Sequence, residues 1–225
     1  MGSTVIPARP VYTPTVTRGW LITFEGGEGS GKSTQISRLA QHLTGRGFTV
    51  LTTREPGGTP LAEGVRELLL DCRFDPEPLV ELMLLEASRS DHVRRVLRPA
   101  LERGEIVLCD RYADSSTVYQ GVVGGVPREA VRHLNDLATG GLEPDLTVVL
   151  DLDPREGLSR ARARNAVGGG ASRIDDRPLE YHERVRDGFL ELVLSDPERV
   201  RLVPADGTAD EVFALILEAL PEVLK

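Results

Sequence analysis

The sequence predicts one α/β domain of three layers, in which helices cover both faces of a parallel sheet. Short apolar runs, each bounded by charged or turn residues, alternate along the chain with longer amphipathic segments. That alternation is typical of buried parallel strands joined by crossover helices. The length of 225 residues also suits one domain with a substantial core and is short of two ordinary domains.

The expected strands are residues 20–24, 50–53, 106–109, 146–150 and 200–203. The expected helices are residues 33–43, 79–101, 178–194 and 210–220. We expect a five-stranded parallel sheet with the strand order 2-3-1-4-5. Residues 1–18 are rich in Pro, Thr and Ser, so we expect a disordered N-terminal tail followed by a domain over 19–225.

The composition excludes several classes of protein. A net charge of −8 lacks the basic balance of a nucleic-acid binder, so we expect no nucleic-acid partner. No apolar run approaches the ~20 residues that span a bilayer, and the N-terminus has no apolar signal-peptide core, so we expect no membrane partner. Cys72 and Cys109 without secretory context indicate a reducing compartment and a cytoplasmic location.

The strongest motif is GxxxxGK[ST], which lies between the first expected strand and the first expected helix. In this context it predicts a P-loop, where glycines let backbone N–H groups surround phosphate oxygens and a helix N-terminus adds its positive dipole. Lys32 is placed to reach the β- and γ-phosphates of ATP, and the Ser33 hydroxyl is placed to bind Mg²⁺. The expected ATP-binding residues of the motif are Gly26, Gly27, Glu28, Gly29, Ser30, Gly31, Lys32, Ser33 and Thr34.

The rest of the chain decides among P-loop classes. A GTPase would carry an NKxD-type guanine-binding motif, which the sequence lacks. A motor or transporter ATPase would have a strand ending in an aspartate near Mg²⁺. Asp110 fits that place, but Arg111 follows it at once.

Two further segments resemble the thymidylate kinase family. Residues 53–59, TREPGGT, are similar to its REPGGT segment, and residues 110–116, DRYADSS, continuing to Tyr119, Gln120 and Gly121, are similar to its DRYxDSSxAYQG segment. Residues 24–26, residues 87–89 and the pair His92-Val93 also fit, and the matches run in family order from about Gly19 to the C-terminal helix. The resemblance implies transfer of the γ-phosphate of ATP to dTMP with Mg²⁺, and a homodimer.

The residues at the ends of the expected strands form an acceptor site. Arg54 and Arg111 follow apolar runs, so both belong at the C-terminal edge of a parallel sheet, where ligands of such folds bind. Planar guanidinium groups suit the dianion of a nucleoside monophosphate. By resemblance, Arg111 holds the dTMP phosphate, Asp110 lies near Mg²⁺, and Arg54 assists at the transferred phosphoryl group.

Glu28 is unusual in a phosphate-binding loop, because two like charges ~4 Å apart repel by ~1 kcal/mol even in water. Either its side chain points to solvent or it has a function. The family resemblance implies that it accepts a hydrogen bond from the 3′-hydroxyl of the deoxyribose. By the same resemblance, Tyr119 lies against the sugar where a 2′-hydroxyl would otherwise go.

The resemblance also implies the base site. Arg89 on the long expected helix hydrogen-bonds the thymine edge with Ser116 nearby. Ser115 and Gln120 are further expected substrate-binding residues. Leu85 stands where the family has Phe or Tyr, so the aromatic stacking on thymine is missing. Asp206 lies in a segment similar to the loop that passes the adenine of ATP, although a turn or helix cap is an alternative role.

Residues 165–172 are rich in glycine and flanked by arginines, which fits either a linker or a mobile lid over about 160–177. Members of the family that the chain resembles supply a basic residue to the transition state either from the P-loop or from the lid. This P-loop contains no basic residue before Lys32, so the resemblance implies that the lid supplies an arginine. The candidates are Arg160, Arg162, Arg164 and Arg173, of which we select Arg164 and Arg173. The expected catalytic set is Lys32, Arg54, Arg111, Arg164 and Arg173.

Two alternatives remain at this point. One is another nucleotide or deoxynucleoside kinase of similar fold. The other is a regulator that hydrolyses ATP slowly without an acceptor.

Overall fold

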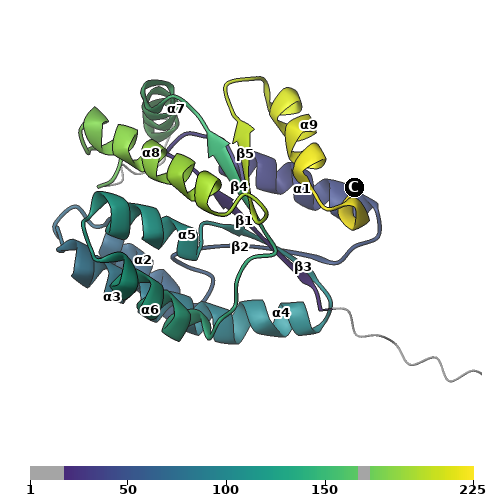
Figure 1. Ribbon diagram of the computed structural model, residues 1–225, viewed down its shortest axis with the longest axis horizontal. Helices are drawn as coiled ribbons and strands as arrows, with labels where there is room; N and C mark the ends of the chain where they lie inside the picture. Colours follow the sequence, from purple (N-terminus) through teal and green to yellow (C-terminus); the bar gives the residue numbers. More distant parts are fainter. Residues whose placement is uncertain (1–17, 167–172) are drawn as a thin grey trace, which may run out of the picture.

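The structure is a computed structural model that describes residues 18–166 and 173–225. In this part of the chain, five parallel strands form one sheet in the order β2-β3-β1-β4-β5 (Figure 1), which confirms the predicted fold and strand order. The strands are β1 (Trp20–Glu25), β2 (Val50–Arg54), β3 (Ile106–Asp110), β4 (Leu146–Asp151) and β5 (Val200–Pro204).

Two layers of helices enclose the sheet (Figure 1). One layer contains α1 (Lys32–Gly45) and α9 (Ala209–Ala219), whose Leu39 and Ile216 pack on Ile22 of β1. The opposite face carries Leu21 of β1, which packs with Leu97. Successive side chains of a strand point to opposite faces of the sheet, and here helices cover both faces. Strands that are buried on both sides are therefore continuous apolar runs, which is why the sequence predicted them.

The remaining helices follow the predicted alternation and add elements that we did not predict. The helical segments expected over 79–101, 178–194 and 210–220 are present within a residue or two at most ends. The first of these contains a π-helical turn. The segment expected over 79–101 comprises α3 (Pro78–His92), η1 (Val93–Leu97) and α4 (Arg98–Glu102), and the one expected over 178–194 is α8 (Leu179–Ser195). The helices that we did not predict are α2 (Pro60–Leu70), α5 (Ala113–Ser116), η2 (Thr117–Val123), α6 (Arg128–Thr139), α7 (Pro154–Ala166) and η3 (Glu222–Leu224).

The strand register brings the polar residues that follow the strands to one edge. Arg54 of β2 and Phe24 of β1 both pair with Asp110 of β3, and the P-loop follows β1 directly. The C-terminal ends of the three strands therefore place the P-loop, Arg54 and Arg111 side by side, as parallel sheets require.

The predicted tail and the glycine-rich centre of the predicted lid lie outside the described residues, except for Arg18 at the end of the tail. Both remain predictions. Among the helices that the structure does describe, none combines the length and the apolar character needed to cross a bilayer.

Candidate functional site

The P-loop has the backbone conformation that its glycines allow. Gly26, Gly29 and Gly31 have φ angles of 125°, 69° and 92°, in the region that side chains disfavour. A Cβ on Gly29 would also lie 2.0 Å from the carbonyl oxygen of Gly157, so α7 packs directly on the loop. Helix α1 begins at Lys32, immediately after Gly31. Its N-terminus therefore faces the loop, as a phosphate site requires.

Lys32 lies inside the loop with a buried side chain. Its Nζ donates hydrogen bonds to the carbonyl oxygens of Gly26 (3.1 Å) and Gly27 (2.9 Å) and lies 3.4 Å from the Ser30 hydroxyl. Burial and then the charge of Arg111 lower the pKa of Lys32, although nearby carboxylates oppose the shift. An anion bound in the loop would restore the favourable environment of this ammonium group.

A cavity of about 790 Å³ extends from the P-loop across the sheet edge to Arg89. Its volume lies within the range typical of small-molecule binding sites. Of the residues predicted from sequence, the cavity is lined by Glu28, Gly29, Ser30, Gly31, Lys32, Ser33, Thr34, Arg54, Leu85, Arg89, Asp110, Arg111, Ser115, Ser116, Tyr119, Gln120 and Arg164. Gly26, Gly27, Arg173 and Asp206 do not line it, although Ala205 and Gly207 on either side of Asp206 do.

Arg111 joins the two halves of the cavity. Its Nη2 donates to Oε1 of Glu28 at 2.7 Å and its Nη1 to the Ser115 hydroxyl at 3.2 Å. Its Cζ lies 5.0 Å from the ring centroid of Tyr119. The residue has a φ of 69°, an unfavourable conformation for a side chain other than glycine, which marks a strained position at a site.

The charges around Arg111 favour its ionised form. Burial opposes this, but Tyr119 and the carboxylates of Glu28 and Glu25 raise the pKa of Arg111. Burial likewise raises the pKa of Glu28, and the charges of Arg111, Lys32 and Arg164 outweigh it and lower that pKa. Glu28 is therefore an ionised hydrogen-bond acceptor. Its side chain faces the cavity and does not point away into solvent.

Glu25 is a fully buried carboxyl behind this ion pair, which sequence reasoning did not select. It accepts hydrogen bonds from the backbone N–H of Tyr112 (2.8 Å) and from the hydroxyl of Ser115 (2.6 Å). Burial raises its pKa to about 7, although Arg111 acts in the opposite direction. The Glu25 carboxyl thus orients the segment that carries Arg111 and Ser115.

Ser33 and Asp110 meet at the mouth of the P-loop. The Ser33 hydroxyl donates to Oδ2 of Asp110 at 3.3 Å. A hydroxyl and a carboxylate are oxygen ligands of the kind that Mg²⁺ takes together with phosphates and waters. Within residues 18–166 and 173–225, no group of three or more His, Cys, Asp or Glu side chains is suited to hold a metal.

Arg66 is a second residue that sequence reasoning missed. It projects from α2 into the cavity, where its Nη1 donates to the carbonyl oxygen of Pro56 at 3.1 Å. Burial, and then the charge of Arg54, lower the pKa of Arg66. Arg54, Arg66 and Arg111 therefore place three guanidinium groups around one end of the cavity, where a dianion would be favoured.

One wall of the cavity contains a buried arginine, Arg89, which is 2% exposed. It donates from Nε to Glu55 at 2.7 Å and from Nη1 to Asn135 at 2.7 Å and Ser116 at 3.1 Å. Nη1 also pairs with Glu86, and Nη2 donates to the carbonyl oxygen of Tyr112 at 3.1 Å. The guanidinium lines the cavity in one fixed orientation.

The predicted lid arginines lie in different surroundings. Arg164 lines the cavity with an exposed side chain, and so does Arg160, whose Nη1 donates to the Ala205 carbonyl oxygen at 3.3 Å. Arg173 lies outside the cavity lining, paired with Asp75 at 2.9 Å and with Glu81. Their roles in the transition state remain predictions.

Comparison with known proteins agrees with this arrangement. The family model for thymidylate kinase matches residues 24–216. The chain is 47% identical over 210 residues to a thymidylate kinase of Caulobacter vibrioides, covering 93% of this chain and 99% of that one. It is 50% identical over 207 residues to that of Deinococcus radiodurans, with 92% and 98% covered. A crystal structure of thymidylate kinase from Ehrlichia chaffeensis superposes with a TM-score of 0.74 at 31% identity, covering 91% of this chain and 100% of that one. The chain therefore belongs to the thymidylate kinase family.

Proposed function

We propose that the protein transfers the γ-phosphate of ATP to dTMP by direct in-line displacement, giving ADP and dTDP. One observation carries the proposal: the P-loop and the three guanidinium groups of Arg54, Arg66 and Arg111 line one continuous cavity, and Arg111 contacts Glu28 of the loop. A donor triphosphate in the loop would then face an acceptor phosphate held by arginines. Positioning and charge neutralisation account for catalysis of this kind, and no covalent intermediate with the protein is needed.

Each side chain has a role in this transfer that its surroundings support. Lys32 binds the β- and γ-phosphates, because its ammonium group lies among the loop carbonyls with a lowered pKa. Arg111 binds the phosphate of dTMP, supported from behind by Ser115. The ionised Glu28 accepts a hydrogen bond from the 3′-hydroxyl. Tyr119 and Leu85 cover the sugar and base, and Gln120 lies beside them with a buried side chain.

Ser33 and Asp110 would hold Mg²⁺, Ser33 directly and Asp110 close by. The metal would neutralise charge on the β- and γ-phosphates when bound. The 3.3 Å hydrogen bond between the two side chains keeps both oxygens at the mouth of the P-loop.

A homodimer is the oligomeric state that we propose. Helices α2 and α3 lie side by side (Figure 1) and expose large apolar side chains to solvent. A second copy of the chain would cover such a surface. The residues are Leu61, Leu68, Leu79, Val80 and Met83. Sedimentation should give a dimer for the wild-type protein and a smaller species for Met83→Glu.

The test of function is a coupled assay of ADP formation with ATP, Mg²⁺ and each nucleoside monophosphate in turn. We expect rapid turnover with dTMP, little turnover without an acceptor, and none for a folded Lys32→Ala variant. ATP turnover that is independent of any monophosphate would instead identify a slow ATPase. A preference for a purine monophosphate would identify another kinase of this fold.

A further inference from the structure

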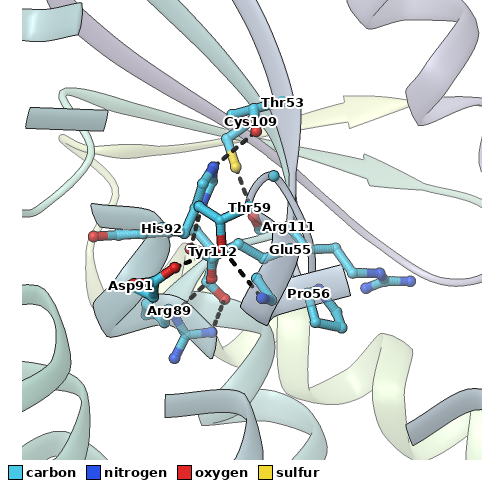
Figure 2. Close-up of polar contacts among 12 residues, drawn as sticks. Thr53, Glu55, Pro56, Thr59, Arg89, Asp91, His92, Cys109, Arg111 and Tyr112 are labelled. Atoms are coloured by element: carbon cyan, nitrogen blue, oxygen red, sulfur yellow. Dashed lines mark hydrogen bonds and ion pairs between the residues drawn. The ribbon is translucent and has the colours of Figure 1, made fainter. Parts of the chain in front are cut away.

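The loop that joins β2 to α2 is tied to helix α3 through one histidine. His92, the last residue of α3, is completely buried and lies between the Thr53 hydroxyl and the Glu55 carboxylate (Figure 2). Its Nδ1 is 2.9 Å from Oε1 of Glu55, and its Nε2 is 2.7 Å from Oγ1 of Thr53. These two contacts come from residues on either side of Arg54, one of the arginines of the acceptor end.

The ring has no room to adopt another position. A Cβ on Gly58 would lie 2.6 Å from both Cδ2 and Nε2 of His92 and 2.8 Å from Oγ1 of Thr53, and Gly58 has a φ of 86°. The loop between β2 and α2 therefore packs tightly against the imidazole ring at Gly58. Because an ionised carboxylate only accepts hydrogen bonds, Nδ1 carries the proton toward Glu55, and in the neutral ring Nε2 accepts from Thr53.

The second oxygen of Glu55 holds Arg89. Oε2 accepts from Nε of Arg89 at 2.7 Å, and both side chains are buried. The guanidinium group is planar, so fixing its Nε–H toward Glu55 fixes the plane of all its donors. Nη2 donates to one acceptor among the residues that the structure describes, the carbonyl oxygen of Tyr112, which leaves its second N–H for a ligand.

We propose that His92 is a positioning residue for pyrimidine selection, which acts by holding Glu55 so that Arg89 presents its free donor to a carbonyl at position 4 of the base. This inference rests on the proposed function. Thymine and uracil carry a carbonyl acceptor at position 4, whereas cytosine carries an amino donor there, and the position-2 carbonyl is common to all three. A guanidinium group can only donate, so a donor aimed at position 4 favours thymine and uracil over cytosine, whereas a donor aimed at position 3 would favour cytosine, whose N3 accepts.

Two substitutions of His92 test its hydrogen bonds to Glu55 and to Thr53 one at a time. In His92→Asn the amide nitrogen stands near the place of Nδ1, so it can still donate to Glu55 and loses only the contact with Thr53. In His92→Gln the amide stands near the place of Nε2, so the donor to Glu55 is lost. Both variants keep a polar side chain at this buried position, and their thermal unfolding is compared first.

The measurements are KM for dTMP and for ATP, and the relative affinities of dUMP and dCMP, as substrates or competing inhibitors. We expect His92→Asn to resemble the wild type. We expect His92→Gln to raise KM for dTMP by roughly tenfold, as loss of a group supporting a binding residue typically does. The preference for dUMP over dCMP should fall with it, and KM for ATP should be unchanged.

Equal behaviour of folded His92→Asn and His92→Gln would overturn the proposal, as would an unchanged preference in His92→Gln. If His92→Gln does not fold, His92→Phe gives the second test. It keeps a planar ring at this position but has no donor for Glu55, so the preference for dUMP over dCMP should fall as in His92→Gln, and an unchanged preference in the folded variant would overturn the proposal. A wild-type protein that phosphorylates dTMP but binds dUMP and dCMP equally contradicts this inference alone. A wild-type protein inactive on dTMP contradicts the proposed function instead.

Discussion

Nη2 of Arg111 lies 2.7 Å from Oε1 of Glu28, so an ion pair joins the acceptor side of the cavity to the P-loop. The pair explains how a carboxylate is tolerated in a loop that binds anions, because Arg111 compensates its charge. It also places Glu28, a residue of the P-loop, beside the arginine that we propose binds the phosphate of dTMP.

Glu28→Ala tests whether this carboxylate also accepts a hydrogen bond from the 3′-hydroxyl of the deoxyribose. A hydrogen bond to a charged group contributes about 1.5–3 kcal/mol, so the wild type should prefer dTMP to its 3′-deoxy analogue by roughly tenfold or more. Glu28→Ala should lose most of that preference in kcat/KM. If the ratio does not change, Glu28 serves as the counter-ion of Arg111 and nothing more.

Glu25→Gln should change how stability depends on pH. The pKa of Glu25 is raised from 4.5 to about 7, so the folded state binds this proton more tightly than the unfolded chain. The stabilisation is complete below pH 4.5 and is lost as the pH rises to about 7. The free energy of unfolding of the wild type, relative to Glu25→Gln, should therefore fall by about 3 kcal/mol across that range.

Denaturant unfolding at a series of pH values measures this difference. Glu222→Gln is the matched control, since its side chain is 88% exposed and should give a flat difference. A Glu25→Gln curve parallel to that of the wild type would show that the buried carboxyl keeps an ordinary pKa.

Arg164→Ala and Arg173→Ala should both lower kcat if each guanidinium reaches the transferred phosphoryl group. An arginine in that role contributes roughly 10³–10⁵ in kcat. Rapid-quench measurement of a single turnover reports the chemical step, and Asp75→Asn controls for the ion pair of Arg173. An effect of about tenfold or less, in either single variant and in the double variant, would be far below the range expected for such an arginine. Arg54 would then be the leading candidate for the arginine that acts on the transferred phosphoryl group.

Leu85→Phe should retain activity and lower KM for dTMP. Leu85 lines the cavity beside Arg89, and an aromatic pair contributes ~0.5–1.5 kcal/mol beyond area burial. The expected gain is at most about tenfold. Loss of dTMP binding in a folded Leu85→Phe protein would show that the position packs the wall and that another side chain covers the base.

The strands were predictable because buried parallel strands are continuous apolar runs, and four of the helices because their apolar residues recur at helical spacing. Helix α2 was missed although its signals were present. Thr59 caps it by accepting from the N–H of Ala62, and Pro60 is its first residue. The interior Gly64 weakens the helical pattern. Arg66 was missed with it, because whether an arginine on a helix faces a cavity depends on how that helix packs.

The surroundings of Arg89 show a different limit. Its partners Glu55, Ser116 and Asn135 are separated from it by 34, 27 and 46 residues. The chain order contains no sign that these side chains converge, since their meeting depends on the positions of β2, α5 and α6 relative to α3. The resemblance to the family predicts that Arg89 contacts the base, but it gave no indication of the buried side chains that hold the guanidinium group in place.

The close approach of Gly157 to the P-loop has a mechanical consequence. A Cβ on Gly157 would lie 2.3 Å from the carbonyl oxygen of Glu28, and one on Gly29 would lie 2.0 Å from the carbonyl oxygen of Gly157. The backbones of the P-loop and of the start of α7 are therefore in close contact, with no room for a side chain at either glycine. Arg160 and Arg164 lie one and two turns beyond Gly157, so any tilt of α7 about this contact would displace Arg164 further than Arg160.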